Sequence, residues 1–196
     1  KLIGNFGIGH VRYPTAGGAG KEFAQPMYVN SPYGITLAHN GNLTNSKQLS
    51  NELFRAEMRH LKTDSDSEVL LNVFAQELGK QREIYPSAKH IFKAVKKTHI
   101  RCDGAYAVLA LITGHGMLAF RDNNGIRPLS IGIRKGKTRD EYIIASEDAL
   151  FISLGFKKLR DIDPGEAIFI DKNGLLHSQQ CADKPQKRPC IFEYVY

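Results

Sequence analysis

Four polar clusters in the sequence carry side chains that suit the chemistry of a small amino acid. The first is HVRYPTAG at residues 10–17, where Arg12 stands in a loop rich in glycine and proline. A guanidinium in such a loop can make two charge-assisted hydrogen bonds to a carboxylate, and the loop can close over a ligand. From this cluster alone, an exposed arginine on a surface loop is the favoured interpretation.

The second cluster is HNGN at residues 39–42. An Asn-Gly pair is most often a tight turn. The pair also suits catalysis, because the side-chain amide of Asn40 and the backbone N–H of Gly41 can point at one developing oxyanion. Both interpretations stay open at this point.

The third cluster is TDSDSE at residues 63–68, and the fourth, the RDNNG cluster, is FRDNNGIRPL at residues 120–129. Ser65 stands three residues before Glu68, which is the spacing of a helix capping box. One carboxylate of this cluster could instead face a pocket and bind a substrate ammonium. The fourth cluster is predicted to be a structural turn held by pairing between its arginine and its aspartate.

Together these groups describe a site for an amino acid whose reacting group is an amide. An arginine serves the carboxylate, an aspartate serves the ammonium, and Asn-Gly serves the oxyanion. The sequence offers no nucleophile for that reaction, because none of Cys102, Cys181 and Cys190 stands in an activating context. Cys102 is expected to be a buried structural thiol.

The elements that position these clusters are predicted to be helices in the middle of the chain and strands on both sides. Apolar periodicity predicts helices over residues 45–60, from 65 or 66 onward, and over 87–100. The first of these is expected to bury Leu49, Leu53 and Met58.

Strand pairs are predicted at 105–113 with 117–120, at 129–134 with 142–145, and at 167–170 with 175–178. A short helix over 147–154 is expected to be capped by Ser146, and the tail 191–196 is expected to be strand-like. Residues 181–190 are predicted to be an exposed connection. The grouping indicates an α+β fold, with antiparallel sheets covered by helices.

Six segments in this order resemble the amidophosphoribosyltransferase family along the whole chain: HVRYPTAG, NSPYGITLAHNGNLTN, TDSDSE, RDNNGIRPL, DPGEAIFI and CIFEYVY. The arginine loop, HNGN and SDSE are shared with the wider class of glutamine amidotransferases that use an N-terminal cysteine. The forms HVRYPTAG, NGIRPL and FEYVY point to this family in particular.

The resemblance implies a role for each cluster. Asn40 and Gly41 would form the oxyanion hole. Arg12 would hold the α-carboxylate of glutamine, Asp66 would hold its α-amino group, and residues 12–23 would close over it. The implied glutamine-binding residues are His10, Arg12, Thr15 and Asp66.

The implied fold is the four-layer sandwich of N-terminal-nucleophile hydrolases, with two stacked antiparallel sheets flanked by helices. Residues 1–180 would be the glutamine amidotransferase domain, and 181–196 would lead toward a phosphoribosyltransferase domain. The family nucleophile is a cysteine at the mature N-terminus whose own α-amino group, with an ordinary pKa of about 7.7–8.0, serves as base. Because the sequence begins at Lys1, we expect that cysteine to lie upstream and these residues alone to be inactive.

The implied reaction releases ammonia from glutamine and passes it to phosphoribosyl pyrophosphate, giving 5-phosphoribosylamine in the first step of purine biosynthesis. Magnesium would serve the phosphoribosyltransferase domain, the full-length enzyme would be a homo-oligomer, and this part would hold no cofactor. An iron–sulfur cluster is not expected, because Cys181 and Cys190 are too far apart for a compact ligand pair. Two alternatives stay open: a sugar-aminating amidotransferase, and a non-catalytic module that kept the pocket but lost the nucleophile.

Composition narrows the class of protein further. The formal charge of +7 is spread over the sequence without the aromatic interleaving typical of single-strand binding, so a solvated basic surface is favoured over nucleic-acid binding. No apolar run approaches the roughly 18 residues of a spanning helix, so no membrane is expected. Three scattered cysteines indicate a reducing compartment, and cytoplasmic localisation is expected.

Overall fold

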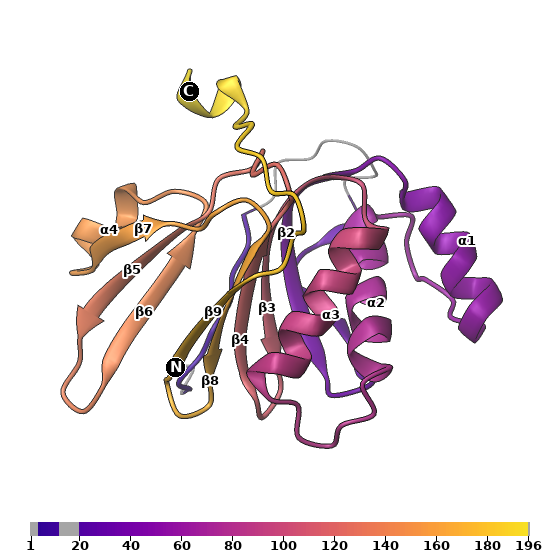
Figure 1. Ribbon diagram of the computed structural model, residues 1–196, viewed down its shortest axis with the longest axis horizontal. Coiled ribbons are helices and arrows are strands. Elements are labelled where there is room, and N and C mark those ends of the chain that lie inside the picture. The colour runs from indigo at the N-terminus through magenta and orange to yellow at the C-terminus, as the bar shows by residue number, and fades with distance from the viewer. Residues whose placement is uncertain (1–3, 12–19, 196) are drawn as a thin grey trace.

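Two antiparallel sheets form the centre of the computed structural model, which describes residues 4–11 and 20–195 (Figure 1). The larger sheet has the strand order β1-β2-β3-β4-β8-β9, and the smaller has the order β6-β5-β7. The strands of the larger sheet are β1 (Met27–Val29), β2 (Ile35–Leu43), β3 (Gly104–Ile112), β4 (Gly116–Arg121), β8 (Glu166–Asp171) and β9 (Leu176–Gln180). The strands of the smaller sheet are β5 (Ser130–Lys135), β6 (Asp140–Ala145) and β7 (Lys157–Asp161).

The helices lie mainly on one side of the larger sheet, while the smaller sheet lies on its other side (Figure 1). The α-helices are α1 (Ser46–Glu57), α2 (Asp66–Gly79), α3 (Ala88–Arg101) and the short α4 (Ala149–Ser153) beside β7. Single 3-10 turns occur at Lys21–Phe23 and Ile191–Tyr194. The expected strand pairs and the three long helices are therefore confirmed.

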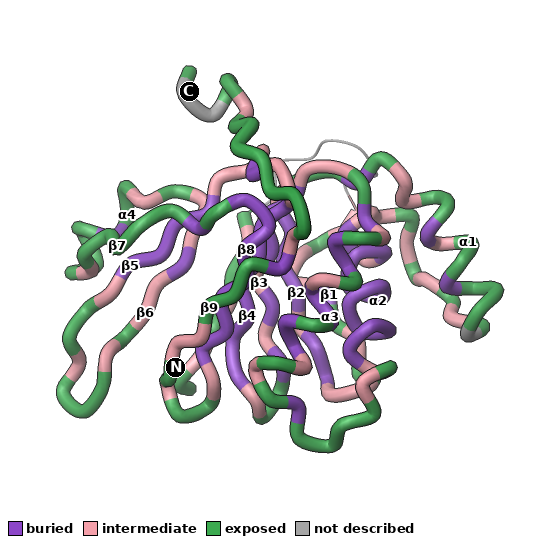
Figure 2. The backbone as a smooth tube through the Cα atoms, viewed as in Figure 1, coloured by how far each residue is buried: buried purple, intermediate pink, exposed green. Residues whose placement is uncertain are grey.

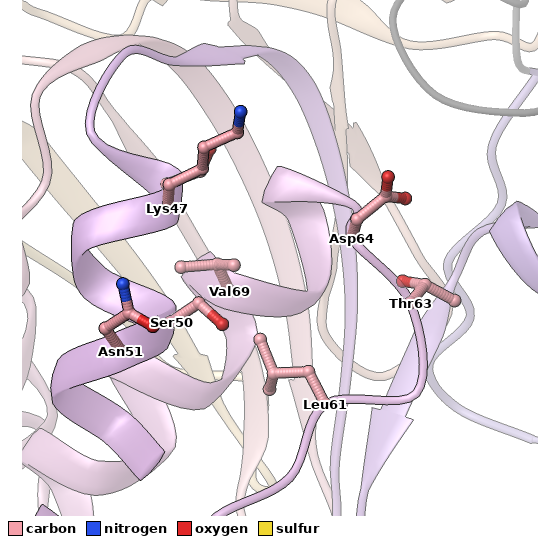
Figure 3. A pocket seen from close by; sticks show the side chains of 8 residues that line it. Lys47, Ser50, Asn51, Leu61, Thr63, Asp64 and Val69 are labelled. Carbon is pink, nitrogen blue, oxygen red and sulfur yellow. The ribbon is translucent and has the colours of Figure 1, made fainter. Parts of the chain in front are cut away.

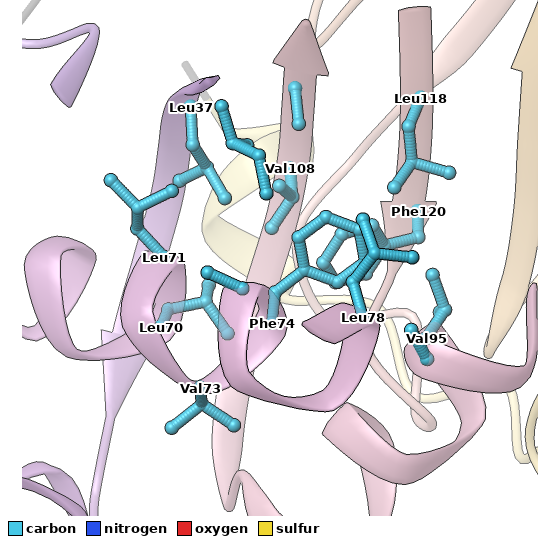
Figure 4. Close-up of a cluster of buried hydrophobic side chains, with 14 of the residues drawn as sticks. Leu37, Leu70, Leu71, Val73, Phe74, Leu78, Val95, Val108, Leu118 and Phe120 are labelled. Carbon is cyan, nitrogen blue, oxygen red and sulfur yellow. The ribbon is translucent and has the colours of Figure 1, made fainter. Parts of the chain in front are cut away.

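Helix α2 is the centre of the first core layer. Its residues from Val69 to Leu78 are buried all round, because β2, β3 and β4 cover one side and helices cover the others. Phe74 packs against Phe120 of β4 with ring centroids 6.0 Å apart (Figure 4). Burial of aromatic rings on this scale dominates core energetics, so α2 is fixed firmly relative to the strands that carry the site.

A second apolar layer joins the two sheets. Strands β3, β4 and β8 contribute one face, and β5 and β6 contribute the other, with residues such as Ala119, Ile168, Ile131 and Ile144 between them. The buried stretches of the sheets and of α2 stand out against exposed loops in Figure 2. The expected arrangement of stacked antiparallel sheets flanked by helices is therefore confirmed.

Some local predictions were wrong. Met58 is 70% exposed and does not join a buried stripe. It takes the left-handed conformation that ends α1, where its N–H donates to the carbonyl of Phe54 at 2.8 Å. The tail is a 3-10 turn and not a strand: Ile191 and Phe192 are exposed, and among the described residues no sheet edge pairs with them, as a strand requires.

Two further differences concern the smaller sheet. The short helix α4 begins after Asp148, so Ser146 is not its cap. Strand β7 was not expected, because all five of its residues are exposed and show no apolar alternation. It forms through backbone pairing with β5, interrupted by a register shift at Ile131 and Gly132.

Candidate active site

The HNGN cluster lies inside strand β2. Its pairing with β3 runs without interruption from Ile35 opposite Ile112 to Leu43 opposite Gly104. The tight-turn interpretation of Asn40 and Gly41 is therefore wrong. Nine consecutive cross-strand pairs outweigh the local preference of Asn-Gly for a turn.

Gly41 could not be replaced by a larger residue without moving the strands. Its φ is +150°, and a Cβ atom there would lie 1.9 Å from the carbonyl oxygen of Ala105 and 2.8 Å from Nε2 of His39. Glycine allows this close approach and this conformation. The backbone N–H of Gly41 is therefore held at a defined position within the sheet.

The N–H groups on the outer edge of β2 are arranged in a row. The N–H of His39 donates to Oε1 of Gln25 at 2.7 Å, and that of Leu43 donates to Oδ2 of Asp66 at 2.9 Å. Because N–H groups in a regular antiparallel strand alternate between its edges, the N–H of Gly41 faces the same edge between these two. This geometry brings the HNGN and TDSDSE clusters together.

The side-chain amide of Asn40 contacts Arg127, in the turn after β4, and Ser146, which follows β6. Its Oδ1 accepts hydrogen bonds from Nε of Arg127 at 3.1 Å and from Nη2 at 2.7 Å. Its Nδ2 donates to Oγ of Ser146 at 3.4 Å. The orientation of the amide is thus defined, because arginine offers only donors.

The side chains of the TDSDSE cluster make different contacts. Ser65 is the N-cap of α2 and accepts from the N–H of Ser67 at 3.3 Å. Glu68 accepts from the N–H groups of Lys62 and Thr63 at 2.9 and 2.8 Å, while the N–H of Ser65 donates to Oγ1 of Thr63. The reciprocal capping box expected between Ser65 and Glu68 is therefore wrong, because each side chain binds another partner. Asp66 is left to bind β2, and its carboxylate sits at the positive end of the helix.

Gln25, His39 and Ser67 form a ring of hydrogen bonds between β2 and the start of α2. Oγ of Ser67 lies 3.0 Å from Nδ1 of His39, and Nε2 of Gln25 donates to the same hydroxyl at 3.0 Å. Burial lowers the pKa of His39 to about 4; the charges of His10 and Arg127 act in the same direction, while Asp66 opposes it. The imidazole is therefore neutral at physiological pH and serves as a fixed part of the scaffold.

The RDNNG cluster is the turn that carries Arg127. The Asp122 carboxylate accepts from the N–H groups of Asn124 and Ile126 at 2.9 and 3.0 Å. The Arg121 guanidinium donates to the carbonyls of Gly125 and Ile162 at 2.7 and 2.8 Å. Both side chains hold backbone groups, and this binding defines the path of the turn.

Of the other candidate residues, only His10 is among those that the structure describes. His10 is half-buried, and its electrostatic interaction with His39 helps to lower the pKa of His39. Arg12 and Thr15 lie outside the described residues. Sequence reasoning missed Gln25, Ser67, Arg127 and Ser146. Ser67 stood in the TDSDSE cluster and Arg127 in the RDNNGIRPL segment, but neither position nor residue type indicated that Ser67 contacts His39 or that Arg127 contacts Asn40.

The cysteines are placed as expected for structural thiols. Cys102 and Cys181 are buried, and burial raises the pKa of each thiol to about 12. A thiol nucleophile requires a depressed pKa and access to substrate. These two residues cannot supply the missing nucleophile.

A surface hollow of about 360 Å³ lies between α1 and the segment that leads into α2 (Figure 3). Lys47, Ser50 and Asn51 line it from α1, while Thr63 and Asp64 line it from the other side. None of Asn40, Gly41 and Asp66 is part of its lining, so it is separate from the candidate site. Over residues 4–11 and 20–195, no group of three His, Cys, Asp or Glu side chains could hold a metal ion. No helix in that part is long and apolar enough to cross a membrane.

Comparison with known proteins gives consistent matches. A family model for the glutamine amidotransferase domain matches residues 19–153. The chain is 56% identical to the amidophosphoribosyltransferase of Pseudomonas aeruginosa and 57% identical to that of Escherichia coli. Each match covers the whole chain and 39% of the relative, so the chain spans about two fifths of the length of these proteins.

Two solved structures share the fold. The glutamine phosphoribosylpyrophosphate amidotransferase from B. subtilis, complexed with ADP and GMP, matches with a TM-score of 0.75 and 32% identity. A structure described as the allosteric regulatory enzyme of purine biosynthesis matches with a TM-score of 0.77 and 34% identity. Both matches cover 95% of this chain and 37% of the other. The expected four-layer sandwich of N-terminal-nucleophile amidotransferases is confirmed.

Proposed function

The chain belongs to the glutamine amidotransferase domain family, and from this we propose that it forms the glutaminase part of an amidophosphoribosyltransferase. The parent protein would hydrolyse glutamine to glutamate and ammonia. The ammonia would then be transferred to phosphoribosyl pyrophosphate to give 5-phosphoribosylamine.

One observation carries the proposal: two separate sequence clusters meet on strand β2. Asn40 and Gly41 are adjacent in the strand, and the N–H of Leu43, two residues after Gly41, is bound by Asp66 at 2.9 Å. Two residues of a strand span about 7 Å, which is similar to the reach of a glutamine side chain. An oxyanion donor and an ammonium acceptor at this spacing suit the two ends of glutamine.

In the proposed reaction, the thiolate of an N-terminal cysteine outside these 196 residues attacks the side-chain amide carbon of glutamine. Nδ2 of Asn40 and the N–H of Gly41 donate to the oxyanion that forms. Asp66 binds the α-amino group, while His10, Arg12 and Thr15 act at the glutamine site, with Arg12 holding the α-carboxylate. The α-amino group of that cysteine, which took the thiol proton, returns it to the amide nitrogen, so that the C–N bond breaks, ammonia leaves and a thioester forms. Water then cleaves the thioester, which releases glutamate and the free thiol.

We assign phosphoribosyl pyrophosphate as the ammonia acceptor because of the similarity to two amidophosphoribosyltransferases. Each of these relatives is identical to the chain at more than half of the aligned residues. Residues 1–180 would form the glutaminase domain, and 181–196 would connect it to a phosphoribosyltransferase domain. Magnesium would act with the pyrophosphate substrate in that second domain. The similarity to these relatives is what favours phosphoribosyl pyrophosphate over the sugar phosphate of the sugar-aminating alternative.

The test is an isotope-transfer measurement on the full-length parent protein. Glutamine labelled with ¹⁵N in its side-chain amide is supplied with phosphoribosyl pyrophosphate and magnesium, or with a keto-sugar phosphate. We expect glutamate release and ¹⁵N in phosphoribosylamine. Label in an amino sugar would identify the sugar-aminating class instead, and no glutamate release with either acceptor would indicate a binding module.

A further inference from the structure

We propose that Arg127 is a positioning residue for the oxyanion hole, because its guanidinium fixes the direction in which the Asn40 amide presents its N–H donors. The proposal rests on the function proposed above, in which Asn40 is an oxyanion donor. It assigns a role in that site to a residue 87 positions away along the sequence.

The contact between Arg127 and Asn40 is directional. Nε and Nη2 of the guanidinium converge on the single Oδ1 atom of Asn40 at 3.1 and 2.7 Å. Rotation of the amide by half a turn would place its NH₂ group against these donors and lose both hydrogen bonds. The guanidinium therefore selects one of the two amide orientations, and Nδ2 must face away from Arg127.

The opposite end of the amide is held much less tightly. Nδ2 donates to Oγ of Ser146 at 3.4 Å, near the upper limit for a hydrogen bond. A substrate oxygen can replace this weak partner at small cost. The positive charge of the guanidinium beside Oδ1 also polarises the amide, which strengthens Nδ2 as a donor to developing negative charge.

Arg127 is itself held by the turn between β4 and β5. Its backbone carbonyl accepts from Nε of Arg121, and the preceding N–H of Ile126 is bound by Asp122. On the other side, the N–H of Cys190 donates to the carbonyl of Ile126 at 3.2 Å. Support of this kind keeps a donor within the narrow range of directions that catalysis needs.

The test is a double-mutant cycle in the full-length protein, with glutamine hydrolysis as the activity. Arg127→Met removes both donors and keeps an unbranched side chain, Arg127→Lys restores a positive donor, and Asn40→Ala removes the amide. We expect Arg127→Met to lower the glutaminase kcat about tenfold to hundredfold, with glutamine KM changed less than about threefold. Arg127→Lys should recover part of the lost kcat.

In the Asn40→Ala background, Arg127→Met should cause no further loss of kcat, because the group that it positions is already gone. Arg134→Met is the matched control, since Arg134 is an exposed β5 arginine that binds Glu141 and the carbonyl of Leu154; its kcat should equal that of the wild type.

Two results would overturn the positioning role. One is an equal loss of kcat from Arg127→Met in both backgrounds. The other is a folded Arg127→Lys protein whose loss is the same as that of Arg127→Met. Failure of the function proposed above looks different: Asn40→Ala alone would then leave glutamine hydrolysis unchanged, or the unaltered parent would hydrolyse no glutamine.

Discussion

Asp66 joins a structural contact and a proposed substrate contact in one carboxylate. Asp66→Asn keeps an oxygen for the N–H of Leu43, which now lies 2.9 Å from Oδ2, but removes the charge that would attract the α-amino group of glutamine. We predict that glutamine KM rises at least about tenfold, in line with the loss of a charge-assisted hydrogen bond. The melting temperature should change little. Glutamine kinetics and thermal unfolding of the full-length protein check both.

The neighbouring Asp64 gives the control, because it is exposed and two residues away. Asp64→Asn should leave both glutamine KM and stability unchanged. A lower melting temperature of Asp66→Asn with unaltered glutamine kinetics would mean that Asp66 only joins α2 to β2.

At the residue scale, the sequence indicated which side chains to consider but not how they meet. Asn40, Gly41 and Asp66 stood in recognisable clusters of suitable types. The placement of Asn40 and Gly41 in β2 depends on pairing with β3, which lies more than 60 positions downstream, and Asp66 approaches them from the first turn of α2. Arg127 could not be connected with Asn40 from sequence, because the contact exists only after β4 has paired with β3 and the turn that follows β4 has been placed near β2.

At the element scale, the packing of α3 on β3 buries a titratable group. His99 is 4% exposed, its Nδ1 lies 2.8 Å from the hydroxyl of Tyr106, and burial lowers its pKa from 6.5 to about 4. Between these pH values the unfolded chain binds a proton that the folded chain does not. The free energy of unfolding is therefore not reduced by His99 above pH 6.5, and it decreases as the pH drops from 6.5 toward 4.

We predict that proton binding to His99 in the unfolded state lowers the free energy of local unfolding by about 2 kcal/mol when the pH is lowered from 7.5 to 5. His99→Gln cannot titrate and keeps a partner for Tyr106, so its stability should fall less over this range. Hydrogen exchange of the α3 amides in the full-length protein, at both pH values, measures the difference. Equal acid destabilisation of variant and wild type would show that the shift in pKa is wrong.

The elements themselves were predictable to the extent that their apolar patterns were clear. Helices α2 and α3 and the hairpin of β3 with β4 have strong patterns and were found with small errors at their ends. Strand β7 carries no pattern, because all five of its side chains are exposed. The tail residues are apolar enough for a strand, but a strand also needs a partner edge, and local composition does not report one.

At the scale of the whole molecule, stacked antiparallel sheets with helices on the outside followed from the grouping of elements. The chain spans about two fifths of the length of its curated relatives, and the proposed nucleophile lies outside it. We therefore predict that a polypeptide of these 196 residues releases no glutamate from glutamine, while the full-length parent does. Cys102 and Cys181 cannot substitute, because each is buried with a pKa of about 12.

A glutamate-release assay on the purified polypeptide checks this prediction, with a Cys190→Ser version to exclude the third thiol. Turnover of about 1 per second or more, as is typical of enzymes, would mean that a residue within the chain is the nucleophile.

The most direct measurement for the proposed oxyanion hole is the kinetics of Asn40→Asp in the full-length protein. Aspartate keeps an oxygen for Arg127, now 2.7 Å from Nη2, so folding should be preserved. It loses the Nδ2 donor and places a negative charge where the oxyanion forms. We predict that glutaminase kcat falls by about two to three orders of magnitude. Glutamine KM should stay within a few-fold, and synthesis from external ammonia should remain. A folded Asn40→Asp protein with glutaminase kcat within a few-fold of wild type would contradict the proposed mechanism.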